Sequence, residues 1–249
     1  MSDYLVHTQR ILTAVDEFDF LARIKPSAVM EYFQDIANAH AVKLRVGFED
    51  LKSQNLFWVL NRLSAVIEKQ PTIGEPIIIT TYPHKPNMAD AIRDYIVENT
   101  NGETLIRGTS RWCVLDMNSK AIRRCAPIFK FNADEYNPEF ALDEGNIRLP
   151  EIEEIEGERR LRHGFVNITD IDRNRHMNNA RYADLVVNTC DFEYYSTHSI
   201  KAFDFNFLSE MRVNSEYTVE MRTVDDKSYF EAKGNSECPI FRARIVWDK

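Results

Sequence analysis

Two stretches of similar plan decide the fold. In the second half, HGFVNITDID (163–172) is followed by NNARYADLVVNTCDFEYY (178–195). The first has the pattern of a strand that ends in a turn, and the second carries apolar residues at helical spacing. In the first half, the strand-like stretch 10–20 precedes PSAVMEYFQDIANAHAVKL (26–44), whose apolar residues also recur at helical spacing. This internal repeat predicts two similar structural units.

Each helical stretch is followed by several strand-like ones. They cover residues 57–68, 75–83, 89–99 and 104–116 in the first half, and 201–210, 216–224, 228–234 and 239–248 in the second. Asn101-Gly102 and Asp225-Asp226-Lys227 are typical of hairpin turns between antiparallel strands. One helix laid across an antiparallel sheet buries an apolar face of both. We therefore expect an α+β fold in which each half is a long helix against an antiparallel sheet.

The polar and acidic stretch 132–162 separates the two halves. We place the boundary at Pro150, which predicts a first domain over residues 1–150 and a second over 151–249. The alternative is a single α+β domain with one long loop, and a length of 249 residues fits either organisation.

The composition excludes several classes of protein. Hydrophobic residues make up 44% and charged residues 28%, which excludes a disordered chain. A net charge of -8 argues against a nucleic-acid partner, because such proteins normally carry a basic field. No apolar run approaches the roughly 20 residues that span a bilayer, and no signal-peptide pattern is seen. The four cysteines and six histidines show no metal-ligand spacing. We expect a cytoplasmic protein with no membrane partner, no metal and no cofactor.

The segment DIDRNRHMNN (170–179) is the strongest candidate for chemistry. His176 lies there close to Asp172 and Asn174, just before a helix that one of the two following asparagines would cap. A carboxylate can orient a histidine, a histidine handles protons near neutral pH, and amide or helix N–H groups can stabilise an oxyanion. On these residues alone, an ordinary turn rich in Asn and Asp explains the segment almost as well.

The pattern D-x-N-x-H-x-N-N-x-x-Y at residues 172–182 resembles the active-site motif of the acyl–acyl carrier protein (ACP) thioesterases. WVLNRL (58–63), P-x-x-GE (71–75), AIRDY (91–95) and SRW-x-VLD (110–116) resemble the same family, in the family's order. The resemblance implies two tandem hotdog domains, each a long helix wrapped by an antiparallel sheet. It also implies hydrolysis of fatty acyl-ACP thioesters, which releases free fatty acid and terminates fatty acid synthesis.

The resemblance also assigns site residues. The catalytic positions of the family correspond to Asp172, Asn174 and His176, and a further acidic position corresponds to Glu210. Plant members carry a cysteine after that acid, whereas this chain has Met211, which cannot form a thiolate. We therefore expect direct attack by water. Asn174 and the first N–H groups of the helix would hold the carbonyl, Glu210 with His176 would activate the water, and Asp172 would orient the network. The sequence leaves open which of His176 and Glu210 is the general base.

Alternation along the strand 201–210 bears on this site. Three phenylalanines at alternate positions share one face and are expected in the core. Without a bulge, the other face carries Asp204, Asn206 and Glu210, which we then expect to point into the site.

The repeat assigns different tasks to the two halves. Aligning Asp19 with Asp172 puts Leu21 and Arg23 at the places of the asparagine and the histidine. Because the first half lacks that pair, we expect it to bind the acyl chain while the second half supplies the chemistry. A plain core position explains each candidate acyl-lining residue equally well. These candidates are Phe33, Ile36, Trp58, Leu60 and Trp112.

The expected partner is an acyl carrier protein that bears a fatty acyl-phosphopantetheine. Carrier proteins are acidic and so is this chain, so docking requires a local basic patch. Arg173 and Arg175 beside the motif are the best-placed candidates. Other basic clusters are Lys120, Arg123 and Arg124, and Arg159, Arg160 and Arg162 in the linker.

Two other functions and two assemblies stay open on the sequence. The protein could be a hotdog thioesterase that acts on acyl-coenzyme A, or a non-catalytic hotdog protein that binds acyl chains. Two hotdogs in one chain permit a monomer, and an exposed sheet edge permits a homodimer.

Overall fold

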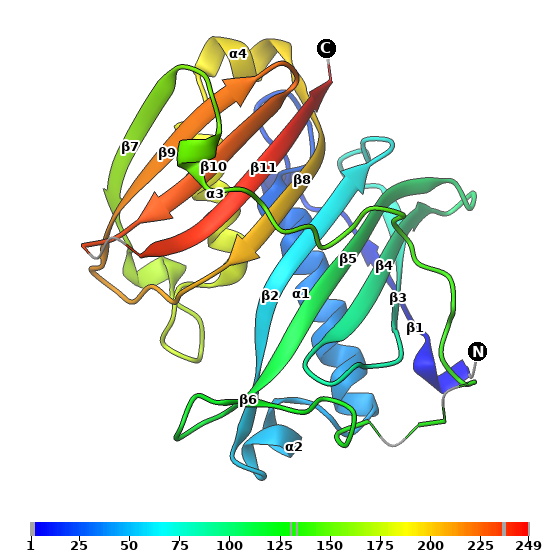
Figure 1. The fold of residues 1–249 in the computed structure, drawn as a ribbon. Helices are drawn as coiled ribbons and strands as arrows, with labels where there is room; N and C mark the ends of the chain where they lie inside the picture. Colours follow the sequence, from blue (N-terminus) through cyan, green and yellow to red (C-terminus); the bar gives the residue numbers. More distant parts are fainter. Residues whose placement is uncertain (1–2, 130, 133, 236–237, 249) are drawn as a thin grey trace. The chain divides into compact units, whose positions relative to one another are not determined.

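The computed structural model describes residues 3–129, 131–132, 134–235 and 238–248 (Figure 1). The chain divides into two compact units, one formed by residues 1–16 and 31–146 and the other by residues 17–30 and 147–249. Residues 17–30, which the sequence analysis assigned to the first domain, thus cluster with the second unit. No helix among the described residues is long and apolar enough to cross a membrane.

The first unit contains an antiparallel sheet in the order β1-β3-β4-β5-β2 (Figure 1). Its strands are β1 (His7–Leu12), β2 (Leu56–Ile67), β3 (Pro76–Pro83), β4 (Ala91–Asn99) and β5 (Thr104–Asp116), with β6 (Ile122–Arg123) paired to β5. Its helical elements are η1 (Asp3–Leu5), α2 (Phe48–Lys52) and most of α1 (Pro26–Lys43). The helix begins at Pro26, as predicted, because the first turn of a helix tolerates a missing N–H.

The core of the first unit lies between α1 and the sheet. The Phe33 ring of α1 is fully buried and stacks on Tyr95 of β4, with ring centroids 4.2 Å apart. Gly108 of β5 leaves room for this ring, because a Cβ there would lie 2.1 Å from Phe33 Cε2. The missing side chain at Gly108 thus lets the Phe33 ring of the helix lie directly against the sheet.

The second unit contains an antiparallel sheet in the order β8-β11-β10-β9-β7 (Figure 1). Its strands are β7 (Arg159–Phe165), β8 (Ser199–Phe207), β9 (Glu216–Val224), β10 (Lys227–Lys233) and β11 (Pro239–Asp248). Its helices are α3 (Asn179–Thr189) and α4 (Phe192–Thr197), and short 3-10 turns are η3 (Ile152–Glu154) and η4 (Ile168–Asp170). A further turn, η2 (Val15–Glu17), follows β1. The α+β prediction is confirmed.

The predicted helix 178–195 is two helices. Asn178 caps α3 by accepting the N–H of Ala180 at 2.9 Å, which confirms one of the two predicted caps. Asp191 then caps α4 with its carboxylate, so the helical path restarts there. An apolar stripe that continues across a break cannot reveal the break, because the residues of both helices face one core.

Two other predictions are wrong in detail. The strand expected over 10–20 ends at Leu12, and the chain then forms η2 and the loop that precedes α1. The stretch 132–162 was expected to be linker throughout, but its last residues begin β7, which pairs with β9. The three arginines assigned to the linker are therefore strand residues. They contact Glu220, Asp191 and the carbonyl of Asn188 at 2.8–3.0 Å.

The rest of the linker is attached to the sheet face opposite α3. The Asn206 side chain accepts the N–H of Leu149 and donates to the carbonyl of Ile147, both at 2.9 Å. Asp204 pairs with Arg244 on β11 at 2.8 Å. The expectation that Asp204 and Asn206 point into the site is therefore wrong, because that sheet face holds the linker and cross-strand ion pairs.

Candidate active site

The polar segment before α3 closes into a tight loop. Ile171 and Met177 form an isolated antiparallel bridge at its base. Inside that bridge, the N–H of Asp172 donates to the carbonyl of His176 at 2.8 Å. The two ends of the loop are therefore held together, and His176 lies at its end, shortly before α3 begins at Asn179.

The Asp172 carboxylate organises the inside of this loop. It accepts the backbone N–H groups of Asn174 at 2.8 Å and of His176 at 3.3 Å. Its second oxygen lies 3.3 Å from the Asn174 side-chain nitrogen, so it orients the amide. Arg175 takes the left-handed conformation that the turn requires, with φ 65°. Asp172 thus acts on the backbone of His176 and on the side chain of Asn174.

Glu210 reaches His176 from the turn after β8. The carboxylate oxygen Oε2 lies 3.0 Å from His176 Nε2, and the two side chains are 45% and 23% exposed. The two turns are joined by a hydrogen bond of 2.8 Å from the N–H of Met177 to the carbonyl of Met211. The two side chains are thus open to solvent, while the hydrogen bond between Met177 and Met211 fixes the backbone of the two turns that carry them.

Tyr182, the last residue of the motif, supports the same turn. Its side chain is buried, with the ring edge-on to Phe207 and Phe241 at 5.6 and 5.3 Å between centroids. Its hydroxyl hydrogen-bonds the Met211 backbone. Burial, followed by the nearby charges of Glu210 and Asp172, raises the pKa of Tyr182 well above its usual range. The sequence pattern placed this tyrosine on the apolar stripe of the helix and predicted no role for it in the site.

The helix start offers fewer donors than predicted. The N–H of Ala180 is bound by the Asn178 side chain, and the N–H of Arg181 donates to the Asn178 carbonyl at 2.9 Å. The N–H of Asn178 itself donates to the Asp170 carbonyl at 2.8 Å. The exposed Asn174 amide, held by Asp172 through one N–H, is consequently the best-placed donor for a substrate carbonyl.

The cysteine and methionine positions agree with a site without a thiolate. Met211 is buried beneath the turn that carries Glu210. Burial raises the pKa of the Cys190 thiol, at the end of α3, to about 12. Among the described residues, no group of three or more His, Cys, Asp or Glu side chains could hold a metal ion.

The remaining predicted residues fall in two places. Arg173 and Arg175 are exposed on the loop of the second unit. The candidate acyl-lining residues belong to the first unit, where Phe33, Ile36 and Leu60 are buried core residues. The indole nitrogens of Trp58 and Trp112 donate to the Val46 carbonyl and to Ser110 Oγ, at 2.8 and 2.7 Å. Their role toward an acyl chain stays a prediction.

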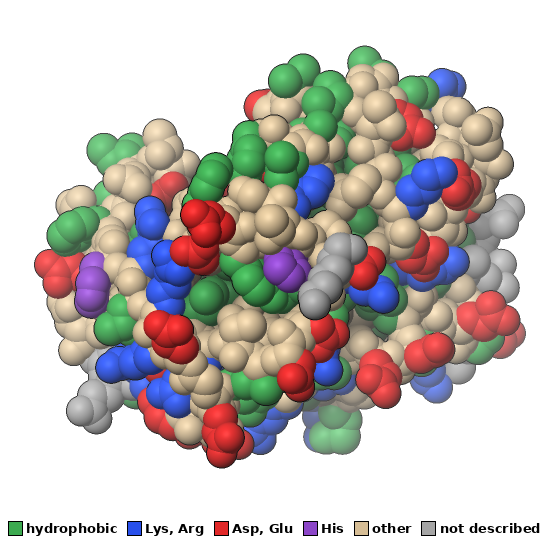
Figure 2. Space-filling model, turned by 90° about the horizontal axis from the view of Figure 1, so that it is seen from above, with side chains coloured by type: hydrophobic (Ala, Val, Ile, Leu, Met, Phe, Trp, Pro, Cys, Tyr) green, Lys and Arg blue, Asp and Glu red, His purple; other side chains and the backbone are tan. Residues whose placement is uncertain are grey.

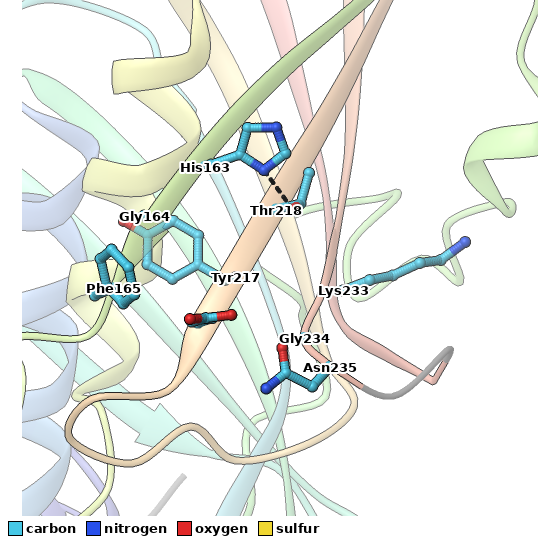
Figure 3. Close-up of a pocket in the computed structure, with 9 residues that line it drawn as sticks. His163, Gly164, Phe165, Tyr217, Thr218, Lys233, Gly234 and Asn235 are labelled. Atoms are coloured by element: carbon cyan, nitrogen blue, oxygen red, sulfur yellow. Dashed lines mark hydrogen bonds between the residues drawn. The ribbon is translucent and has the colours of Figure 1, made fainter.

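A shallow groove of about 290 Å³ lies elsewhere on the second unit (Figure 3). It is lined by residues of β7, β9 and the end of β10, and it includes His163, whose Nδ1 lies 2.8 Å from Thr218 Oγ1. None of its lining residues belongs to the histidine–glutamate pair.

Comparison with known proteins shows which family the sequence of this chain matches. Residues 4–130 match the model of the acyl-ACP thioesterase N-terminal domain, and residues 155–249 match that of the C-terminal domain. The palmitoyl-acyl carrier protein thioesterase of Gossypium hirsutum is 26% identical over 194 residues, which is 73% of this chain and 46% of that protein. The chain thus spans about half the length of this curated relative.

Two solved structures share the fold over nearly the whole chain. An acyl-ACP thioesterase from Bacteroides thetaiotaomicron has a TM-score of 0.85 with 19% identity and covers 100% of both chains. The 12:0-ACP thioesterase from Umbellularia californica has a TM-score of 0.83 with 19% identity, over 98% of this chain and 97% of that one. Fold and site together define a tandem hotdog protein with a histidine–glutamate pair, and the predicted hotdog architecture is confirmed. More particularly, this chain belongs to the acyl-ACP thioesterase family.

Proposed function

We propose that the protein hydrolyses the thioester of fatty acyl-ACP and releases free fatty acid, which terminates fatty acid synthesis. The observation that carries this proposal is the 3.0 Å contact between His176 and Glu210, formed beside the oriented amide of Asn174. A proton acceptor next to an oxyanion donor is what attack of water on a thioester carbonyl requires.

In the proposed reaction, water is the nucleophile. The His176–Glu210 pair takes a proton from the water as its oxygen bonds to the carbonyl carbon, and the Asn174 amide holds the oxygen that becomes negative. When the carbon–sulfur bond breaks, the pair returns the proton to the leaving thiolate of the carrier's prosthetic arm. A covalent cysteine step is not needed, and buried Met211 supplies none.

We propose that the carrier protein docks beside this loop. Figure 2 shows acidic and basic side chains interspersed over the face that it displays. Because the chain as a whole has a net charge of -8, docking of an acidic partner depends on local arginines. Arg173 and Arg175 are exposed on the loop that carries Asn174 and His176. The first domain would bind the acyl chain through the residues named above. A cytoplasmic location and a monomeric or homodimeric assembly remain predictions from the sequence.

The test offers the purified protein a series of acyl-ACP thioesters and the matching acyl-coenzyme A thioesters. Released fatty acid is measured directly, because exposed Cys238 would react with a thiol reagent. Faster release from the ACP series supports the proposal, and faster release from coenzyme A would assign the chain to the second substrate class. No release from either series would overturn it.

Matched variants test the site itself. His176→Ala and Glu210→Gln should each lower kcat by about 100-fold or more, the usual share of a proton-transfer group. Glu216→Gln, at an exposed glutamate a few residues along the chain, is the control and should keep the wild-type rate. If Glu210→Gln keeps full activity, the carboxylate has no part in activating the water.

A further inference from the structure

The first half of the chain contains a second copy of the active-site loop. Phe18 and Ile24 form the isolated bridge at its base. The N–H of Asp19 donates to the carbonyl of Arg23 at 2.9 Å, and the N–H of Ala22 donates to the carbonyl of Asp19 at 3.0 Å. The corresponding distances in the second loop are 2.8 and 3.0 Å.

The aspartate carboxylates of the two loops also accept the equivalent backbone N–H groups. Asp19 accepts the backbone N–H groups of Leu21 at 2.8 Å and Arg23 at 2.9 Å. In the second loop, the equivalent bonds of Asp172 are 2.8 and 3.3 Å long. Ala22 has φ 56°, where the second loop has a φ of 65°. Residue for residue, the two loops are the same backbone structure.

The turn that carries Glu210 has a counterpart after β2. In both turns, two consecutive N–H groups bond to one carbonyl of the neighbouring strand at 2.9–3.1 Å. A left-handed residue follows in each turn, Gly74 with φ 76° and Asn214 with φ 64°. When the two turns are aligned on these N–H groups and left-handed residues, Gln70 corresponds to Glu210 in the sequence.

The two copies differ at the positions that handle protons or bind an oxyanion. Leu21, Arg23 and Gln70 replace the asparagine, the histidine and the glutamate. The Arg23 guanidinium pairs with the Asp19 carboxylate at 2.9 Å and donates to the carbonyl of His198 at 2.7 Å. The first loop therefore keeps its aspartate although the side chains needed for hydrolysis are missing from it.

We propose that Asp172 is a positioning residue, whose role is to build the loop that presents Asn174 and His176. The first loop is the internal control, because Asp19 makes the same backbone bonds without catalytic neighbours. Both Asp172 oxygens are already occupied, one by two backbone N–H groups and the other by the Asn174 amide. This inference rests on the proposed function, and it leaves proton transfer to His176 and Glu210 alone.

The test compares Asp172→Asn, Asp172→Ala and Glu210→Gln in the full chain. An asparagine can still accept both backbone N–H groups through its oxygen, but its own NH₂ group then faces the NH₂ group of Asn174. The amide resonances of the loop should therefore stay in place, while kcat falls about tenfold or more. The pH–rate profile should keep its shape and KM its value. Alanine removes the acceptor, so the amide resonances of residues 174 and 176 in a ¹H–¹⁵N spectrum should move and kcat should fall at least about 100-fold.

Glu210→Gln should lose a similar factor while those amide resonances stay in place. The proposal is overturned if Asp172→Asn changes the pH–rate profile, because a positioning residue does not itself exchange the proton. It is also overturned if Asp172→Ala leaves the amide resonances unmoved. If the wild type hydrolyses no thioester, the proposed function fails, whereas the spectra of the two Asp172 variants still decide whether this carboxylate builds the loop.

Discussion

Acid should destabilise the first unit through a buried histidine on α1. His40 is 1% exposed, its Nδ1 lies 2.9 Å from Arg93 Nη1, and its Nε2 lies 3.0 Å from the Tyr4 carbonyl. Since a guanidinium only donates, Nδ1 must accept, and Nε2 carries the proton that is donated to the carbonyl. A second proton on the ring would face the buried guanidinium, with His7 and Lys43 also close by.

The magnitude follows from the pKa of this histidine. Burial, and next the charge of Arg93, lower the pKa of His40 from 6.5 to about 4. Between these values the unfolded chain binds more protons than the folded one. The contribution of His40 to the free energy of unfolding is therefore complete above pH 6.5 and is lost as the pH falls toward 4. The free energy of unfolding should drop by about 2 kcal/mol between pH 7.5 and 5, and by about 3 kcal/mol in all.

His40→Gln provides the measurement, because glutamine keeps one donor and one acceptor but does not titrate. Urea unfolding is followed by tryptophan fluorescence, to which Trp58 and Trp112 of this unit contribute. The advantage of the wild type over the variant should shrink by about 2 kcal/mol from pH 7.5 to 5. His163→Gln, at an exposed histidine, is the control and should follow the wild-type curve. A wild-type advantage that stays constant over this range would refute the reasoning.

Three further predictions concern the site and the core. Tyr182→Phe keeps the ring packing and removes the hydroxyl that holds the glutamate-bearing turn, so kcat should fall about tenfold at unchanged KM; an unchanged kcat would show that the hydroxyl holds nothing needed for hydrolysis. Gly108→Ala should lower the free energy of unfolding by about 1–3 kcal/mol, because the new Cβ overlaps the Phe33 ring. A thermal melt measures this, and Phe33→Leu in the same chain should recover part of the loss; no recovery would mean that the clash lies elsewhere. Reversing the charge of Arg173 and Arg175 should raise KM for acyl-ACP about tenfold and leave KM for acyl-coenzyme A nearly unchanged. An equal rise for both substrates would contradict carrier docking at the loop.

Local features were predictable because neighbours in the chain decide them. Helical spacing located α1, a proline marked its first turn, and an asparagine marked the cap of α3. Hairpin residues at 101–102 and 225–227 separated strands that do pair in the structure. The alignment of Asp19 with Asp172 also rested on sequence alone, and the two loops make the same backbone hydrogen bonds.

Features that depend on partners far along the chain were missed or misplaced. The exposed strand β7 has little apolar pattern of its own and becomes a strand because β9 offers it an edge. Asp204 and Asn206 alternate correctly with the core phenylalanines, but the face they occupy holds the linker and an ion pair. Nothing in the spacing of residues could show what covers that face.

The sequence by itself therefore determined the α+β class, the tandem repeat and the loop that carries Asn174 and His176, since each depends on local periodicity or on bonds within a few residues. The family resemblance predicted that Glu210 acts with His176, but only the tertiary structure shows how the two meet. Their turns are distant in sequence and are joined by the backbone bond from Met177 to Met211. The tertiary structure also separated scaffold from chemistry. The sequence shows an aspartate in both loops, but only the three-dimensional bonds show that each carboxylate is occupied in building its loop.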